Sequence, residues 1–241
     1  DDVSFGVLQG EIRAIIGPNG AGKSSMLNCI NGFYHPHSGH ITFKGETRQK
    51  MKTHQAAKQG IARTFQNIAL FKGMATLDNI MTGRNLKMKS GLLAQALYWG
   101  VAQREEAEHR EAVEHIIDFL EIQPIRKTPV GRLPYGLQKR VELGRALAME
   151  PELLLLDEPM ASLDAPGRSL ILSYLRRVHT DFGIPMIYVS HSMSEVISIA
   201  SHALILSEGK VVGFGVASSL LGNPVASGSI SNSSNPQQFD N

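Results

Sequence analysis

Cysteine is nearly absent from this chain of 241 residues, because Cys29 is the only one. A single cysteine cannot form a disulfide within the chain, and it cannot build a metal site from several thiolates. The sequence therefore excludes disulfide-stapled secreted domains and cysteine-ligated zinc modules, and it fits a reducing compartment such as the cytoplasm.

Long apolar runs and an excess of charge are missing as well. The most apolar stretches, at 153–156 and 203–206, have the length of a strand rather than the ~20 residues of a membrane-spanning helix. The 24 basic and 22 acidic residues give a net charge of +2, which provides no electrostatic argument for binding nucleic acid. We therefore expect a soluble chain that reaches a membrane only through a partner, and we expect no nucleic-acid partner.

Enough apolar material is present for a substantial core, since 42% of the residues are hydrophobic and 19% are charged. Strand patterns are expected at 11–16, 41–43, 61–65, 153–157, 186–190, 203–207 and 210–214. Helical patterns are expected at 23–31, 103–120, 136–149, 167–180 and 193–200. Strands alternate with helices at both ends, and a helical block lies between them. This order predicts an α/β fold with a mainly parallel sheet and an inserted helical subdomain.

A glycine-rich segment follows the first of these strands. Residues 17–24 read Gly-Pro-Asn-Gly-Ala-Gly-Lys-Ser and match the phosphate-loop pattern G-x-x-x-x-G-K-[ST] without a gap. Glycine lets successive backbone N–H groups point at phosphate oxygens, and the following helix adds its N-terminal dipole. We expect Lys23 to bridge the β- and γ-phosphates, Ser24 to bind Mg²⁺ and Ser25 to reach the α-phosphate. The sequence therefore predicts a nucleotide site formed by Gly17, Pro18, Asn19, Gly20, Ala21, Gly22, Lys23, Ser24 and Ser25.

Two adjacent carboxylates end the apolar strand at 153–157. In a phosphate-transfer site, Asp157 can hold Mg²⁺ through water. Glu158 points the other way and can polarise the attacking water as a general base. A strand that ends in Asp-Glu is often only a solvated strand end, but its place downstream of a phosphate loop favours the functional interpretation.

These motifs resemble those of the ATP-binding-cassette ATPases. Residues 153–159 look like the Walker B segment of that family, and the segment Ala161-Ser162-Leu163-Asp164 resembles its D-loop. Gln66 stands where these proteins keep the Q-loop glutamine, which links Mg²⁺ and water to the transmembrane partner. His191 resembles the switch histidine that contacts the γ-phosphate. The resemblance therefore implies catalytic roles for Glu158, His191 and Gln66, a metal site of Ser24, Gln66 and Asp157, and a nucleotide contact at Asp164.

The resemblance also implies a domain organisation. Residues 1–75 and 150–221 would form a RecA-like ATP-binding core of the P-loop NTPase type, with antiparallel strands near the N-terminus. Residues 76–149 would form the helical subdomain, and 222–241 a flexible tail. The segment 60–67, Gly-Ile-Ala-Arg-Thr-Phe-Gln-Asn, is similar to the ATPase subunits of branched-chain amino-acid importers, as are the stretches at 91–93 and 104–107. The amino-acid cargo rests on this resemblance alone.

The family's signature, Leu-Ser-Gly-Gly-Gln, is altered here to Leu133-Pro134-Tyr135-Gly136-Leu137. Pro134 removes a hydroxyl group, and Leu137 replaces the glutamine. The helix that follows still offers free N–H groups and a favourable dipole to an anion. We expect Tyr135 and Gly136 to contact ATP bound by a second subunit. A non-hydrolysing subunit is the alternative, and the intact Glu158 and His191 argue against it.

The resemblance further implies two kinds of partner and a location. A second ATPase subunit, identical or paralogous, would complete the nucleotide sites. A transmembrane permease would place the chain at the cytoplasmic face of the membrane, peripherally. Phe71, Tyr98 and Trp99, within the segment 67–100, would receive a coupling helix of the permease, although ordinary packing explains them equally well.

The first residues suggest a start inside a domain. Asp1 is not an initiator methionine, and Val3–Val7 alternates like a strand. The adenine-stacking aromatic residue of the family would lie upstream of the first strand, so none is assigned.

Two other function classes compete with an ATPase that drives transport. A soluble cassette ATPase acting on DNA or ribosomes usually carries tandem cassettes, coiled coils or zinc insertions, and none of these stands in the sequence. A P-loop kinase or GTPase explains neither the altered signature nor His191, and the guanine-reading Asn-Lys-x-Asp is missing.

Overall fold

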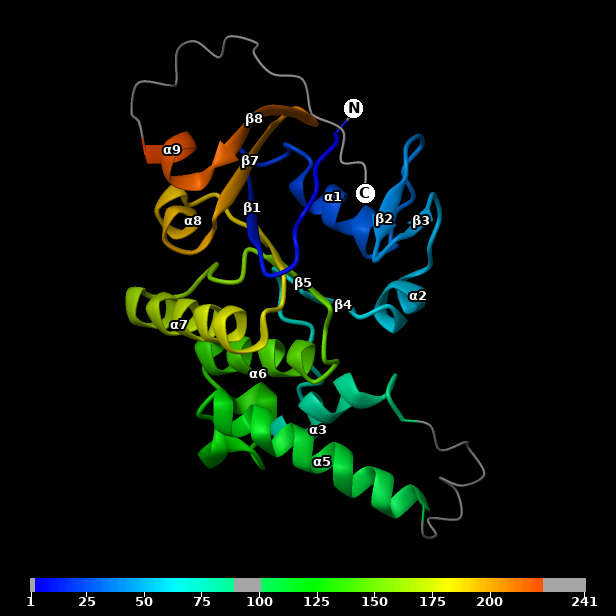
Figure 1. The fold of residues 1–241 in the computed structure, drawn as a ribbon. Coiled ribbons are helices and arrows are strands. Elements are labelled where there is room, and N and C mark those ends of the chain that lie inside the picture. Colours follow the sequence, from blue (N-terminus) through cyan, green and yellow to red (C-terminus); the bar gives the residue numbers. More distant parts are fainter. Residues whose placement is uncertain (1–2, 89–100, 223–241) are drawn as a thin grey trace.

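The computed structural model describes residues 3–88 and 101–222, and a six-stranded sheet forms its centre (Figure 1). The strands lie in the order β4-β5-β6-β1-β7-β8. Their bounds are β1 (Ile12–Ile16), β4 (Ile61–Thr64), β5 (Leu153–Asp157), β6 (Met186–Val189), β7 (His202–Ser207) and β8 (Lys210–Val216). Neighbouring strands are parallel except for the pair β7 and β8. The predicted α/β fold with a mainly parallel sheet is confirmed.

A separate two-stranded antiparallel ribbon joins β2 (Ile41–Phe43) to β3 (Glu46–Arg48). Lys44 and Gly45 form its turn with φ angles of 51° and 81°, a left-handed pair that suits a tight hairpin. Helix α2 (Thr53–Lys58) follows. Neither β3 nor α2 is among the strands and helices expected from the sequence.

The predicted strand at Val3–Val7 is wrong. Val3, Phe5 and Val7 are half-buried and pack against the core beside α1 (Lys23–Ile30), while Ser4 and Gly6 are exposed. Among the described residues this segment belongs to neither sheet. Its alternation therefore records one-sided burial without the backbone pairing that defines a strand.

Helices cover both faces of the central sheet. Helix α1 lies on one face, and α7 (Ala165–Phe182) and α8 (Met193–Ile199) lie on the other (Figure 1). Strand β5 shows the division, because Leu153 and Leu155 belong to the cluster beside α1, whereas Leu154 and Leu156 belong to the cluster beside α7. A short helix, α9 (Ala217–Gly222), follows β8. It includes Gly222, the first residue of the predicted tail; the rest of that tail lies outside the described residues.

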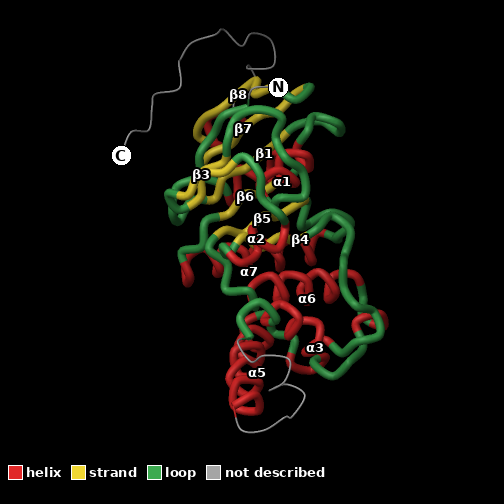
Figure 2. Tube along the Cα trace, turned by 90° about the vertical axis from the view of Figure 1, so that its right-hand side faces the viewer, coloured by secondary structure: helices red, strands yellow, loops and turns green. Residues whose placement is uncertain are grey.

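A helical insertion lies between β4 and β5, at the opposite end of the molecule from β8 (Figure 2). The helix expected at 103–120 is present and buries one face, since Val113, Ile117 and Leu120 are fully buried and Ile116 packs against the same cluster. Neither the longest helix nor any other described helix combines the length and apolarity that crossing a bilayer requires. The α-helices of the insertion are α3 (Thr76–Met81), α5 (Val101–Phe119) and α6 (Tyr135–Leu147); its short 3-10 helices are η1 (Thr82–Arg84), η2 (Gln123–Ile125) and η3 (Val130–Arg132).

Burial of β5 on both faces predicts a large cost for truncating it. Replacing Leu155, which is 0% exposed, with alanine removes apolar contacts and leaves a cavity, so we expect a loss of about 2–5 kcal/mol in the free energy of unfolding. Urea unfolding followed by circular dichroism measures this change. Leu8→Ala is the matched control, because Leu8 is 62% exposed and its truncation should leave the unfolding midpoint in place. Equal effects of the two substitutions would contradict the described packing.

Candidate nucleotide site

The predicted site residues meet at one edge of the central sheet. The loop 17–22 leaves β1, Gln66 follows β4, Asp157 ends β5 with Glu158 directly after it, and His191 follows β6. All four strands are parallel, so their carboxyl ends share this edge, where parallel sheets bind ligands. The topology therefore brings together residues that lie far apart in the sequence.

Glycine is required at three positions of the loop. Gly20 and Gly22 have φ angles of 83° and 98°, which other residues rarely adopt. At Gly17, a Cβ atom would lie 2.2 Å from the backbone oxygen of Leu206. The loop therefore approaches β7 too closely for any side chain at Gly17, and it continues directly into α1.

The lysine of the loop is held by the loop itself. The Lys23 ammonium donates hydrogen bonds to the backbone oxygens of Gly17, at 2.7 Å, and Pro18, at 3.0 Å. Lys23 is only 6% exposed, so these carbonyl groups compensate for its lost hydration. The neighbouring residues, from Pro18 to Gly20 together with Ser24 and Ser25, are exposed. Their polar groups are therefore open to an incoming phosphate.

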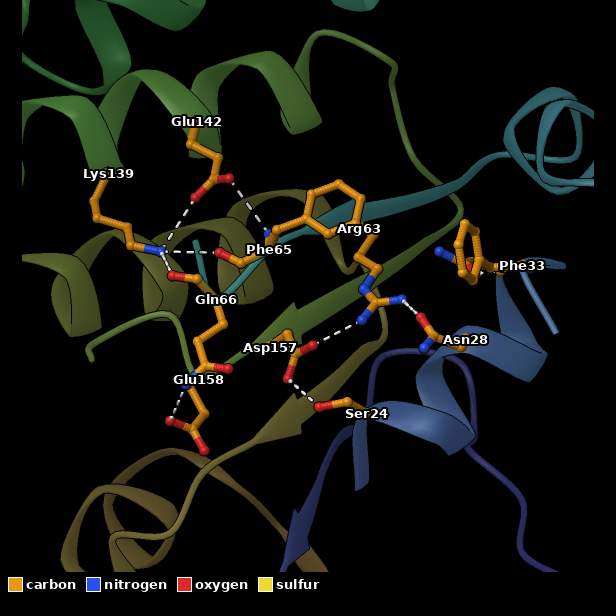
Figure 3. Close-up of polar contacts among 11 residues, drawn as sticks. Ser24, Asn28, Phe33, Arg63, Phe65, Gln66, Lys139, Glu142, Asp157 and Glu158 are labelled. Carbon is orange, nitrogen blue, oxygen red and sulfur yellow. Dashed lines mark hydrogen bonds and ion pairs between the residues drawn. The ribbon is translucent and has the colours of Figure 1, made fainter. Parts of the chain in front are cut away.

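The two carboxylate oxygens of Asp157 have different partners (Figure 3). Oδ2 forms an ion pair with Arg63 Nη2 at 2.7 Å, and the Arg63 and Asp157 side chains are 7% and 6% exposed. Oδ1 accepts a hydrogen bond from the Ser24 hydroxyl at 3.4 Å. Oxygen donors of this kind suit Mg²⁺. Ser24 and Asp157 therefore fit the predicted metal site, with Oδ1 on the side toward the phosphate loop.

Arg63 is a site residue that sequence analysis missed. Its Nη1 also donates to Asn28 Oδ1 of α1 at 2.5 Å, and its guanidinium group lies 5.1 Å from the centre of the Phe65 ring. It therefore connects β4, β5 and α1 beneath the site. The available signal was a basic residue within a short strand that is expected to be buried, because such a residue needs a buried acidic partner.

Glu158 occupies a strained position where two other predicted residues converge. Its φ angle is 46°, which is uncommon for a residue other than glycine and recurs at functional sites. Gln66 Nε2 donates a hydrogen bond to Glu158 Oε2 at 3.3 Å, and His191 Nδ1 lies 3.5 Å from the same oxygen. The backbone N–H of Glu158 donates to the oxygen of Val189 at 3.0 Å. The three predicted catalytic side chains therefore form one cluster.

The turn that carries His191 is anchored by Glu195 of α8. Glu195 Oε2 accepts hydrogen bonds from the Tyr188 hydroxyl at 3.0 Å and from Ser190 Oγ at 2.9 Å. Ser190 Oγ in turn accepts one from the Ser192 N–H at 3.0 Å. Burial raises the pKa of Tyr188, and the negative charge of Glu195 raises it further. Tyr188 therefore stays protonated and remains a donor at neutral pH.

The altered signature forms a second group, at the start of α6. Pro134 is the residue before the helix, with φ −54° and ψ 151°, as suits proline at a helix start. Tyr135 is 38% exposed and shares a side-chain hydrogen bond with Ser162. Burial raises the pKa of Tyr135, and Glu142 contributes. Asp164 Oδ1 accepts a hydrogen bond from the Gly167 N–H at 3.0 Å and so caps α7.

Comparison with known proteins agrees with this geometry. Residues 1–161 match the family model described as ABC transporter. The chain is 30% identical over 222 residues to the high-affinity branched-chain amino acid transport ATP-binding protein BraF of Pseudomonas aeruginosa, covering 92% of this chain and 87% of BraF. It is 33% identical over 211 residues to the sulfate/thiosulfate import ATP-binding protein CysA of Xanthomonas campestris, covering 88% of this chain and 57% of CysA. Among solved structures, a nucleotide-free ATP-binding cassette from an ABC transporter superposes with a TM-score of 0.79 at 28% identity, covering 93% of this chain and 89% of that one.

The Arg63–Asp157 pair predicts a stability that depends on divalent cations. Replacing Arg63 with methionine leaves the Asp157 carboxylate buried without its cation, so we expect unfolding to become easier by about 3–5 kcal/mol. Magnesium bound at Asp157 would supply the missing charge. Thermal unfolding should therefore show a larger rise in Tm on adding Mg²⁺ for the variant than for the unchanged protein. Arg126→Met, at an exposed position, is the control; an Arg63→Met protein indifferent to Mg²⁺ would contradict the metal site.

Proposed function

The chain belongs to the ABC transporter family and is an ATPase of that family, and from this premise we propose that it energises the import of branched-chain or related amino acids. The observation that carries the catalytic part is the convergence of Gln66 and His191 on the strained Glu158. The cargo is proposed from the similarity to BraF along 92% of the chain.

In the proposed reaction, the phosphate loop holds the triphosphate with its backbone N–H groups and with Lys23. Glu158 accepts a proton from the attacking water as the water oxygen bonds to the γ-phosphorus. The bond between that phosphorus and the bridging oxygen breaks, which leaves ADP and phosphate. His191 would contact the γ-phosphate, and Ser25 the α-phosphate. Mg²⁺, held by Ser24, Asp157 and Gln66, would offset the phosphate charge.

A second ATPase subunit, identical or paralogous, completes the proposed site. Tyr135 is exposed and begins α6, and Gly136 is the second residue of that helix, so both stand at a helix N-terminus that favours an anion. They would contact the nucleotide of that subunit, together with Asp164. We also propose that residues 1–75 and 150–221 form the ATP-binding core and that residues 76–149 form the helical subdomain, because the chain belongs to this family.

The proposed permease surface adjoins Gln66. Phe65 and Phe71 are 40% and 56% exposed. Asn79 is fully buried and exchanges hydrogen bonds with the main chain of Phe71, at 2.8 Å and 3.0 Å, so the loop that presents Phe71 is fixed. Such a rigid apolar surface suits a coupling helix. Binding there would hold the chain peripherally at the cytoplasmic face; Tyr98 and Trp99 lie outside the described residues.

Glu158→Gln tests the catalytic assignment. The substitution keeps the shape of the side chain but removes the proton acceptor, so steady-state ATP turnover should fall by at least about 100-fold. Calorimetry should show that Mg-ATP still binds. Glu111→Gln, at an exposed position on α5, should leave turnover unchanged. Turnover that survives Glu158→Gln would show that another group activates the water.

The cargo is tested with the complex purified from membranes and placed in vesicles. We expect ATP-dependent uptake of labelled leucine or valine, and no uptake of labelled sulfate, which is the ligand named for CysA. Glu158→Gln vesicles serve as the matched control, because they contain the same proteins without turnover. Uptake of sulfate instead of leucine would overturn the proposed cargo and leave the ATPase assignment in place.

A further inference from the structure

A buried ion pair on α6 lies beside the segment that carries Gln66 (Figure 3). Lys139 and Glu142 are 4% and 1% exposed, and Lys139 Nζ lies 3.3 Å from Glu142 Oε2. A buried pair of charges recovers its desolvation cost only when further hydrogen bonds satisfy its remaining donors and acceptors. Those further partners show what the pair holds.

The partners all belong to the main chain of residues 65–69, called here the Q-segment. Lys139 Nζ donates to the backbone oxygens of Phe65, at 2.9 Å, and Gln66, at 3.1 Å. Glu142 Oε1 accepts from the backbone N–H groups of Phe65, at 3.4 Å, and Ala69, at 3.5 Å. The pair therefore binds both N–H donors and carbonyl acceptors of the Q-segment main chain. No side chain of that segment takes part.

The same helix contacts the Q-segment again one turn later. The Arg145 guanidinium group donates to the backbone oxygen of Ala69. At its other end, α6 begins with Tyr135, four residues before Lys139. The Gln66 side chain extends from this main chain, which the pair holds, to Glu158. One rigid helix therefore connects the signature to the residue that touches the general base.

We propose that Lys139 and Glu142 are positioning residues that fix Gln66 relative to the signature helix, so that a displacement of α6 moves Gln66 with it. The inference rests on the proposed role of Gln66 in ATP hydrolysis. Neither residue touches the reacting atoms, and both act through the backbone of the Q-segment. Closure of a second subunit against α6 would in this way be sensed at Glu158 within the same chain.

Stability and positioning can be separated experimentally, because replacing both members of a buried ion pair with apolar residues is often neutral for stability. The test is the double variant Lys139→Met, Glu142→Leu in the full chain. We expect its Tm and its affinity for ATP to stay close to those of the unchanged protein. Hydrogen exchange of residues 64–71, followed by mass spectrometry, should become roughly tenfold faster, and kcat should fall on the order of 10- to 100-fold with KM little changed.

Two further variants sharpen the result. The exposed pair Arg104–Glu108 on α5, with side chains 87% and 69% exposed, supplies the matched control Arg104→Met, Glu108→Leu, which should alter none of these measurements. Lys139→Arg keeps a cation with several donors and should retain most of the exchange protection and turnover.

The outcomes distinguish the positioning role from the proposed function. Unchanged exchange at residues 64–71 in the Lys139→Met, Glu142→Leu protein would overturn the inference, as would faster exchange with undiminished kcat. Gln66→Ala is measured in parallel. If Gln66→Ala retained full turnover, the proposed role of Gln66 would be wrong, and a link from this pair to hydrolysis through Gln66 would be wrong with it. The exchange data would then report only on how the pair holds the Q-segment.

Discussion

The ion pair between Arg63 and Asp157 is the interaction on which the nucleotide site depends. A carboxylate at the end of the fully covered strand β5 is costly to bury without a cation and hydrogen bonds. Arg63 supplies the cation from the adjacent strand, and its second hydrogen bond, to Asn28, fixes α1 in the same arrangement. The phosphate loop is the connection between β1 and α1, so the cation also determines where that loop stands relative to Asp157. Because Arg63 occupies only Oδ2, the other oxygen remains directed at Ser24.

The sheet provides the second constraint, since it must be apolar in its interior and polar at one edge. Strand β5 meets both requirements. Its leucines belong alternately to the two core clusters, the strand ends at Asp157, and Glu158 follows it. The chain passes from buried leucines to acidic residues within one position, and the strained backbone of Glu158 lies directly after this change. In the neighbouring turn, the partly buried Glu195 carboxylate accepts hydrogen bonds from Tyr188 and Ser190. His191 stays exposed beside Glu158.

The parts of this arrangement that depend on local pattern were predictable from the sequence. The phosphate-loop pattern, the strand before Asp157 and Glu158, and the parallel sheet follow from spacing and periodicity, and the structure confirms the mainly parallel sheet. The hydrogen bonds from Lys139 and Glu142 to the Q-segment were not predictable in this way, because they join positions more than 70 residues apart. Alternation misled at Val3–Val7 for a related reason, since burial on one side is a local property whereas strand pairing requires a partner elsewhere. The roles of the site residues stay predictions: the nucleotide contacts of the phosphate loop, of Tyr135, Gly136 and Asp164, the metal site, and the catalytic roles.

In the proposed contact with a second subunit, a residue of the altered signature would be needed by something outside its own chain. Gly136 has an ordinary helical backbone, and a Cβ atom there would meet only Leu163, at a comfortable 3.8 Å, within the part of the chain that the structure describes. Internal packing therefore does not require glycine at this position, in contrast to Gly17, whose Cβ would clash with β7. A glycine that internal packing does not need is suited to the close approach of a ligand or a second subunit. Pro134 changes the chemistry offered to that ligand, because it contributes no hydroxyl, yet it leaves the start of α6 intact. The helix N-terminus can therefore still attract an anion without a side-chain hydroxyl, so under the proposed function the site is altered rather than inactive.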